Sequence, residues 1–343
     1  MKISSPILAL ALSAVPTAYG WGANGHMAVG FIAMPFLSPK ALSFVQSSLG
    51  STYNESLGPA ATWADDVKSE AAYKWSADLH FVDAEGLLLS FSVTRPIEPP
   101  KQTTLQLLVL FPRVVIVVTD NVSVSLHIWT YFRYGFAQYD LQCSVTAIAN
   151  YTTRVVETSL SAMQRQEALK FLGDIGQPLH VEALEVGGND ISVKCSGSTS
   201  NLHSVWDSGI INKLLAANYS NSVPVWSNNL IARIKTGAFK SLASNWISCS
   251  SVTEPLSRRN IEDDIAGILH PRAITPLECP LVWAQESNAF DCSFVFNFST
   301  GQDLCTSSYF TNAVPIIEMQ IAKQGFRLAA WLNVLFDGAT NLP

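Results

Sequence analysis

The fold is decided by residues 315–338, which read PIIEMQIAKQGFRLAAWLNVLFDG. Apolar residues recur there every three or four positions, as they do on one face of an α-helix. They are Ile317, Ile321, Leu328, Leu332 and Leu335. Pro315 is typical of the first turn of a helix, and Gly338 is typical of its end. The pattern therefore predicts a helix between these two residues, with its apolar face in a core.

Further helical signals lie on the N-terminal side of this stretch. Ser38-Pro39 predicts an N-cap followed by the first turn of a helix, which Gly50 would end. Apolar spacing from Thr152 to about Ile175 predicts another helix, ended by Gln177-Pro178. Strand-like sequence is scarce outside residues 87–142. We therefore expect an all-α fold class.

Composition limits what the chain can be. It has 343 residues, 48% of them hydrophobic and 14% charged, with a formal net charge of −6. A disordered chain would show the opposite balance of apolar and charged residues. A protein that grips duplex DNA through its phosphates would need an excess of Lys and Arg. Because no repeat or flexible linker divides the sequence, we expect one mainly helical domain over residues 21–343.

Residues 1–20 have the pattern of a secretory signal peptide. Lys2 supplies a positive charge, and Ile7 to Val15 form an apolar stretch too short to span a bilayer. Ala18-Tyr19-Gly20 places small residues where signal peptidase cleaves, which would make Trp21 the mature N-terminus. We therefore expect a secreted protein.

Two other features agree with secretion. The glycosylation sequons are at Asn54, Asn121, Asn150, Asn218 and Asn297. The six cysteines are Cys143, Cys195, Cys249, Cys279, Cys292 and Cys305. They permit disulfides without revealing their pairing, and the absence of C-x-x-C disfavours a thiolate metal site.

Histidines and aspartates carry the chemistry that can be predicted. His203 and Asp207 are four residues apart, so on a helix they share a face and can bind one cation. The other candidates are Trp21, His26, Asp65, His80, Asp174 and His180. Imidazole and carboxylate ligands together suit zinc. Taken singly, a histidine is more often an ordinary core or surface residue than a metal ligand.

Several motifs occur in one order along the chain. They are Trp21-Gly22-x-x-Gly25-His26, Trp63-Ala64-Asp65, Leu79-His80-Phe81-Val82-Asp83, Ala147 to Thr152, Gly173-Asp174-x-x-Gln177-Pro178-Leu179-His180, Gly187-Gly188-Asn189 and Asn201-Leu202-His203-x-x-Trp206-Asp207. Together they resemble the secreted single-strand-specific zinc nucleases of fungi and plants, also called 3′-nucleotidase/nucleases. These enzymes are relatives of the zinc-dependent phospholipases C.

The resemblance implies a site of three zinc ions. One would be held by the α-amino nitrogen and carbonyl oxygen of Trp21 together with His26, and a second by Asp65 and His80. Asp174 would bridge these two ions. The third would be held by His180, His203 and Asp207. Lys68 would neutralise charge in the transition state, and Asp65 and Asp174 would belong to the catalytic centre. Phe81 and Val186 would sandwich a base, while Asp83 and Asn189 would hydrogen-bond its edge.

The resemblance also implies the partners. We expect single-stranded DNA, RNA and 3′-nucleotides as substrates, no membrane, and a monomer. Affinity would come from zinc–phosphate contacts and base stacking, which needs an unpaired base. This reconciles an acidic protein with a nucleic-acid substrate.

Two departures from the family pattern affect these expectations. Lys170 stands four residues before Asp174, where the family has a histidine ligand, as if one helical turn were missing before Gly173. Residues 87–142 replace a short cysteine-containing loop in which partners of Cys143 and Cys292 would lie. This segment could be translated intervening sequence or another gene-model error, or a genuine insertion packed on the surface.

Three functions therefore stay open. The first is a secreted zinc nuclease and 3′-nucleotidase, impaired by the missing histidine. The second is an inactive secreted glycoprotein of the same fold that binds nucleotides or metal. The third is a zinc-dependent phospholipase C, which shares the ligand types.

Overall fold

The computed structural model describes residues 21–81, 144–156, 159–160, 175–247 and 278–342. Some sequence predictions lie outside the described residues: the signal peptide at 1–20, the segment 87–142, and Asp83, Asn121, Cys143, Lys170, Asp174 and Cys249.

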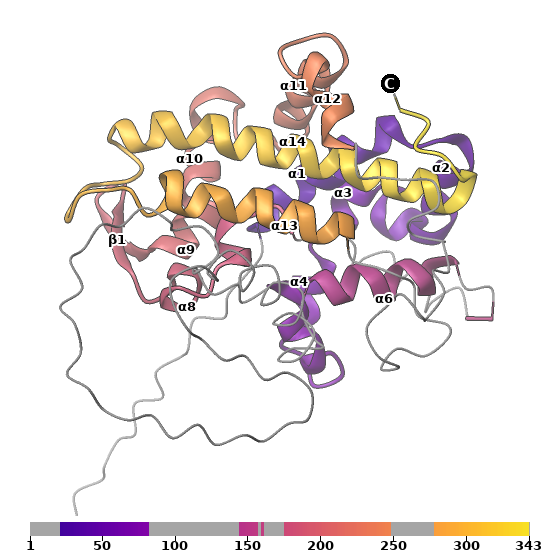
Figure 1. The fold of residues 1–343 in the computed structure, drawn as a ribbon, viewed down its shortest axis with the longest axis horizontal. Coiled ribbons are helices and arrows are strands. Elements are labelled where there is room, and N and C mark those ends of the chain that lie inside the picture. Colours follow the sequence, from indigo (N-terminus) through magenta and orange to yellow (C-terminus); the bar gives the residue numbers. More distant parts are fainter. Residues whose placement is uncertain (1–20, 82–143, 157–158, 161–174, 248–277, 343) are drawn as a thin grey trace, which may run out of the picture.

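Helices form almost all of the regular structure in these described ranges, which confirms the mainly helical fold class (Figure 1). The α-helices are α1 (Ala23–Ala33), α2 (Pro39–Leu49), α3 (Leu57–Ala60), α4 (Trp63–Val67), α6 (Ser144–Val156), α8 (Glu185–Gly188), α9 (Leu202–Ser204), α10 (Ile210–Asn218), α11 (Val223–Lys235), α12 (Lys240–Trp246), α13 (Glu278–Phe290) and α14 (Ser308–Asp337). Short 3₁₀ or π turns connect them: η1 (Met34–Phe36), η2 (Ser51–Tyr53), η3 (Lys74–His80), η5 (Pro178–Val181), η6 (Val205–Gly209) and η8 (Asp291–Val295). Strands β1 (Ser192–Cys195) and β2 (Ser198–Asn201) form one antiparallel hairpin.

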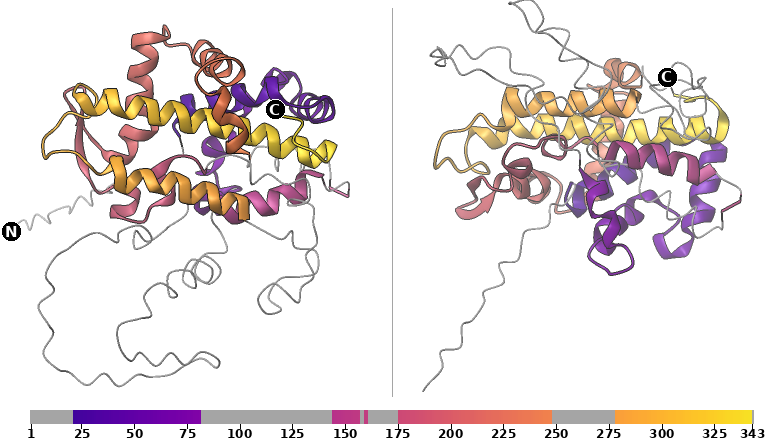
Figure 2. Two further views of the ribbon diagram at one scale, coloured as in Figure 1. Left: turned by 45° about the horizontal axis from the view of Figure 1, so that its top comes forward. Right: turned by 60° about the horizontal axis from the view of Figure 1, so that its bottom comes forward.

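Helix α14 is the central element of the fold. It contacts α1, α2, α6, α10, α11 and α12, and it lies beside α13 in both views of Figure 2. Ile321, Phe326 and Ala330 are fully buried along it. Because α14 is surrounded, its apolar residues belong to two cores, one around Trp206 and one around Trp283.

The predicted start of this helix is wrong. Helix α14 begins at Ser308 rather than at Pro315, because the Ser307 Oγ accepts a hydrogen bond from the backbone N of Tyr309 at 3.3 Å. Pro315 lies inside the helix, where it removes one backbone donor. Tertiary packing outweighs this local cost. The predicted end is confirmed, since Gly338 adopts a left-handed conformation with φ 76°.

The other two predicted helices have different outcomes. Helix α2 begins at Pro39 after Ser38 and ends before Gly50, as predicted. The helix predicted from Thr152 to about Ile175 is interrupted, because α6 ends at Val156 and residues 159–160 form a turn and a bend. The rest of this predicted helix, residues 161–174, lies outside the described residues.

The hairpin β1–β2 was not predicted from the sequence. Ser196 and Gly197 both have positive φ values, 53° and 83°, as a two-residue type I′ turn requires. A disulfide from Cys195 to Cys305 ties the hairpin to the loop before α14. The chain leaves β2 directly into α9, so the hairpin fixes the position of His203.

Asp303 secures the hairpin tip. Its carboxylate accepts hydrogen bonds from the backbone N–H groups of Ser196 (3.0 Å), Gly197 (2.7 Å), Cys305 (2.9 Å) and Thr306 (3.1 Å). Desolvation raises the pKa of Asp303, but these donors outweigh it and lower the pKa to about 2.

We expect Asp303→Asn to destabilise the protein by about 1 kcal/mol at pH 7, the usual cost of a lost side-chain cap. Because the pKa of Asp303 is lower in the folded state, its contribution is present above pH 4 and is lost as the pH falls through about 2. Urea unfolding at pH 7 and at pH 2.5 measures this, with the exposed Asp190→Asn as control. An equal loss of unfolding free energy in Asp303→Asn at both pH values would contradict a stabilising role for the ionised Asp303 carboxylate.

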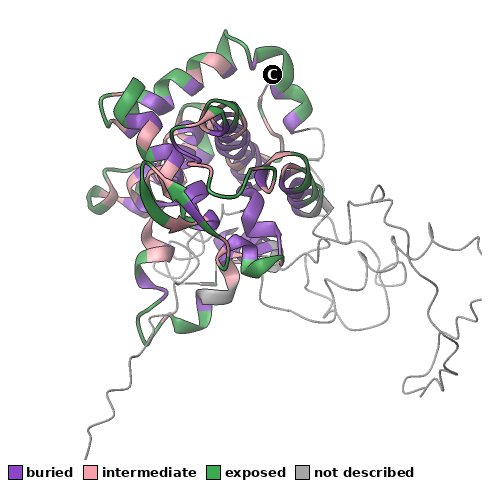
Figure 3. Cartoon of the chain, turned by 90° about the vertical axis from the view of Figure 1, so that its left-hand side faces the viewer, coloured by how far each residue is buried: buried purple, intermediate pink, exposed green. Residues whose placement is uncertain are grey.

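Buried residues gather inside the helical body, and exposed residues cover its outer helices (Figure 3). Within the described residues, no helix has both the length and the apolar character needed to cross a membrane.

Candidate metal centre

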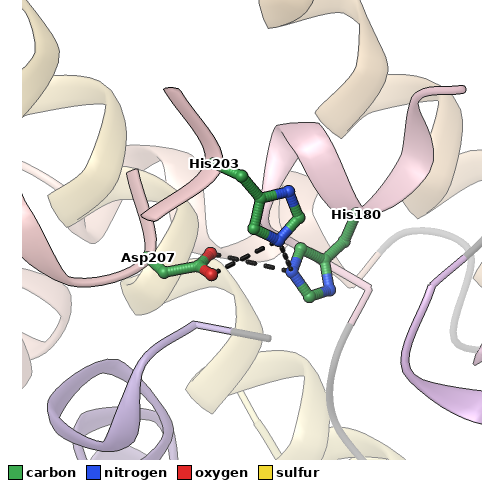
Figure 4. Close-up of side chains that lie close together, drawn as sticks. All are labelled: His180, His203 and Asp207. Carbon is green, nitrogen blue, oxygen red and sulfur yellow. Dashed lines mark hydrogen bonds and ion pairs between the residues drawn. The ribbon is translucent and has the colours of Figure 1, made fainter. Parts of the chain in front are cut away.

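Three predicted ligands meet in one buried cluster. His180, His203 and Asp207 point toward one another in Figure 4. The Nε2 atoms of the two histidines are 3.1 Å apart. The carboxylate oxygens of Asp207 lie 3.3 Å from Nε2 of His203 and 3.7 Å from Nε2 of His180. This is the one group of three or more His, Cys, Asp or Glu side chains suited to a metal among the residues described.

Local structure explains why these three side chains converge. Asn201 caps α9 by accepting a hydrogen bond from the Ser204 backbone N at 2.7 Å. The chain continues from α9 into the π turn η6, which keeps His203 and Asp207 on one face. The predicted proximity of these two residues is confirmed. His180 comes from η5, which begins at Pro178 after the predicted break.

The backbone fixes the orientation of both imidazole rings. The Nδ1 of His180 is 2.7 Å from the carbonyl oxygen of His80, and the Nδ1 of His203 is 2.7 Å from that of Gly187. A carbonyl oxygen only accepts, so each Nδ1 carries the hydrogen and donates it. Both Nε2 atoms therefore present lone pairs to each other and to the Asp207 carboxylate. Converging acceptors of this kind suit a cation, and N–H···O=C contacts behind the ligands are usual for metal-binding histidines.

A second cluster forms around Asp65. Its carboxylate lies 3.0 Å from Nε2 of His26, 2.8 Å from Nζ of Lys68 and 3.3 Å from Nδ1 of His80. Burial raises the pKa of Asp65, but the charges of His26, Lys68 and His80 outweigh it and hold the pKa well below its usual range. The carboxylate is therefore ionised, as a metal ligand must be.

The two clusters share His80. Its imidazole faces Asp65, whereas its carbonyl oxygen accepts from His180. The beginning of α6 is attached at the same point, because the Ser144 hydroxyl donates to the Leu79 carbonyl at 3.1 Å. Residues that are far apart in the sequence are thus held together by backbone contacts.

The predicted mature N-terminus lies against the first cluster. Trp21 is fully buried, and the backbone N of Gly22 donates to the carbonyl oxygen of Asp207 at 2.9 Å. A Cβ at Gly22 would lie 2.0 Å from Oγ of Ser208 and 3.0 Å from the carbonyl oxygen of Asp207, so a larger residue would displace these groups at this close approach.

The predicted base-binding residues are partly described. Val186 is 63% exposed, and Phe81 is partly buried at the end of η3. The Asn189 side chain donates from Nδ2 to the Val186 carbonyl at 2.8 Å. Val186 has φ 56° and ψ 52°, a genuine outlier for a β-branched residue. Strain of this kind concentrates at functional sites.

The predicted modification sites are also partly described. Asn54, Asn218 and Asn297 are exposed, as glycosylation acceptors must be, and the backbone of Asn150 belongs to α6. Cys292 is a free, exposed cysteine.

Sequence reasoning missed two residues that contact the ligands. Gln177 was recognised as the end of a helix and as part of a motif, but not as a contact of a ligand, and its Nε2 lies 2.7 Å from Oδ1 of Asp207. Gly187 was recognised as part of a motif, but its carbonyl oxygen orients His203. The nearness of Gln177 to the candidate ligand His180 in the sequence was the available signal.

The helical fold and the buried His/Asp cluster define a candidate metal-dependent hydrolase. The S1/P1 Nuclease family model matches residues 21–106 and 136–337, so the match is interrupted at residues 107–135. The chain is 33% identical over 322 residues to Nuclease PA3 from a Penicillium species, covering 91% of this chain and 97% of the relative. Identity to Nuclease P1 from Penicillium citrinum is also 33% over 322 residues, with the same coverage. Identity to Nuclease S1 from Aspergillus oryzae is 32% over 339 residues, covering 96% of each chain.

The chain therefore belongs to the S1/P1 nuclease family. This confirms the resemblance recognised in the motifs and places the protein among the nuclease enzymes.

Proposed function

We propose that the protein is a secreted zinc nuclease and 3′-nucleotidase that hydrolyses single-stranded DNA and RNA. The observation that carries this proposal is the convergence of His180 Nε2, His203 Nε2 and the Asp207 carboxylate in a buried site. Two imidazoles and a carboxylate are a ligand set that zinc favours, with one position left for water or substrate. The names of the similar proteins, which are nucleases, agree with it.

The Asp65 cluster would hold further zinc. By the family pattern, His26, Asp65 and His80, together with the N-terminal amine and carbonyl of Trp21 and with Asp174, would bind two more ions. Zinc in these positions supplies Lewis acidity for the phosphate and hydroxide near neutral pH.

The remaining residues would bind and orient the substrate. Lys68 brings a buried ammonium group beside Asp65, where it can pair with a phosphate oxygen. Exposed Val186, with Phe81, offers apolar surface to a base, and Asn189 and Asp83 would contact its edge. Stacking of this kind is worth about 1–3 kcal/mol per base and requires an unpaired strand.

Zinc content and turnover together test this function. We expect the purified protein to bind up to three equivalents of zinc, to cleave single-stranded DNA and to release phosphate from a 3′-nucleotide. A chelator should abolish both reactions, and added zinc should restore them. Hydrolysis of phosphatidylcholine but not of either nucleotide substrate would indicate the phospholipase alternative.

The substitution at Lys170 favours the second candidate function, that of an inactive protein which binds nucleotide or metal. One or two equivalents of zinc without turnover would support it. Inserting a helical turn that carries a histidine between Leu172 and Gly173, with residues 87–142 replaced by a short loop, should then increase the zinc content and raise the rate of hydrolysis at least about 10-fold.

Processing at the N-terminus gives a second prediction. The backbone N of Gly22 donates a hydrogen bond to the carbonyl oxygen of Asp207, and Trp21 is buried. One additional residue before Trp21 should therefore displace the proposed amine ligand. We expect at least about 10-fold lower activity and one zinc fewer per chain. Mass spectrometry of the intact N-terminus, metal analysis and DNA cleavage measure this. Equal zinc and equal rates in the extended and the native protein would refute a role for the Trp21 amine.

A further inference from the structure

Gln177 is fully buried and makes two short hydrogen bonds. Its Nε2 donates to Oδ1 of Asp207 at 2.7 Å, and its Oε1 accepts from the backbone N of Leu179 at 2.6 Å. These contacts connect the segment that carries His180 to the carboxylate that faces it.

The two partners leave the amide one possible orientation. A flipped amide would place Oε1 against a carboxylate oxygen and the NH₂ group against the Leu179 N–H. Acceptor would then face acceptor, and donor would face donor. The donor to Asp207 is therefore fixed by the start of η5.

This donor determines how Asp207 is presented. Oδ1 is held by Gln177, while Oδ2 lies 3.3 Å from Nε2 of His203. Without the donor, the carboxylate would be free to rotate about its side-chain torsions and would lose one buried hydrogen bond.

We propose that Gln177 is a positioning residue for the metal centre, which sets the orientation of Asp207 and the start of the turn that carries His180. The proposal rests on the proposed metal function of His180, His203 and Asp207. The role of Gln177 follows from its contacts alone. Hydrogen bonds behind metal ligands typically affect metal affinity 10–100-fold.

The experiment compares Gln177→Glu with a matched control. Glu has the same shape but places an acceptor against Asp207. Gln320 is also buried, and its Nε2 donates to the Gly176 carbonyl at 3.1 Å and to Oγ of Ser287 at 3.0 Å. Gln320→Glu therefore introduces the same buried carboxyl group near the same segment without touching a ligand.

Two readouts separate positioning from general destabilisation. Zn²⁺ affinity is measured by competition with a chromogenic chelator, and the visible spectrum is measured with Co²⁺ alone in the metal-free protein. We expect Gln177→Glu to weaken the binding of one zinc equivalent 10–100-fold and to alter the Co²⁺ spectrum. We expect Gln320→Glu to lower thermal stability while leaving both metal readouts unchanged.

The outcomes are distinguishable. Wild-type affinity and spectrum in Gln177→Glu would overturn the proposal, and so would the same loss in both variants. If Gln177→Glu does not fold, Gln177→Met removes the donor without adding a charge and carries the same expectation. If the unsubstituted protein binds no Zn²⁺, the proposed metal function fails instead.

Discussion

Replacing Asp65 with asparagine should lower the rate of DNA cleavage at least about 100-fold and remove zinc from the cluster around it. Asp65 lies within 3.3 Å of side-chain nitrogens of His26, Lys68 and His80, so one carboxylate serves three buried partners. Asparagine keeps the shape but loses the charge, and its neutral amide is a poor zinc ligand. Metal analysis and single-turnover cleavage of single-stranded DNA measure the two effects.

The neighbouring Asp66 is the matched control. It lies on the same short helix α4, but it accepts a hydrogen bond from the Thr62 hydroxyl at 3.1 Å in an exposed position. Asp66→Asn should therefore retain zinc and activity. Loss of activity in both variants would indicate that helix α4 is structurally fragile, and retention in both would remove Asp65 from the catalytic centre.

Replacing Asp291 with valine should stabilise the protein by about 1–3 kcal/mol at neutral pH, the usual cost of an unsatisfied buried polar group. Asp291 is fully buried, and its Oδ1 has no hydrogen-bond partner among the described residues. Burial raises its pKa well above the usual value, and the charge of Glu182 raises it further, while a hydrogen bond from Asn288 acts in the opposite direction.

The gain in the free energy of unfolding in Asp291→Val should depend on pH. Because the pKa of Asp291 is higher in the folded than in the unfolded state, the native protein loses stability as the pH rises from about 4 toward the folded-state pKa. The difference between variant and parent should therefore be small near pH 4 and largest at neutral pH. Urea unfolding at pH 4.5 and pH 7.5 measures it. A gain that is independent of pH would indicate better packing by valine rather than removal of a buried charge.

Local signals in the sequence were sufficient for some elements and misleading for others. Ser38-Pro39 and Gly50 predicted the ends of α2 correctly, because proline in the first turn and glycine after the last turn act within a few residues, although the Ser38 side chain makes no capping hydrogen bond. The start of α14 was missed, since Pro315 is a strong local signal that tertiary packing overrides. The hairpin was missed because its strands are only four residues long and mostly polar, although Ser196-Gly197 is a recognisable turn signal.

The candidate site likewise contains some contacts that the sequence predicts and others that it does not. His203 and Asp207 are four residues apart, so helical periodicity was enough to bring them together. The approach of His180 to the His80 carbonyl joins residues that are 100 positions apart, and no pattern of spacing predicts it. Resemblance to a family supplied the grouping of His180 with His203 and Asp207, but it did not supply the contact from Gln177.

The Cys195–Cys305 disulfide joins residues separated by 110 positions. In the chain-entropy model, a cross-link of this span lowers the entropy of the unfolded chain and so raises its free energy by about 5 kcal/mol. The free energy of unfolding is therefore larger under oxidising conditions, where the disulfide is intact, than under reducing conditions. Reduction would also remove the covalent attachment of the hairpin that leads into His203, which would leave the hydrogen bonds to Asp303 to hold it. We expect a copy that remains in a reducing cytosol to unfold more readily than the oxidised protein.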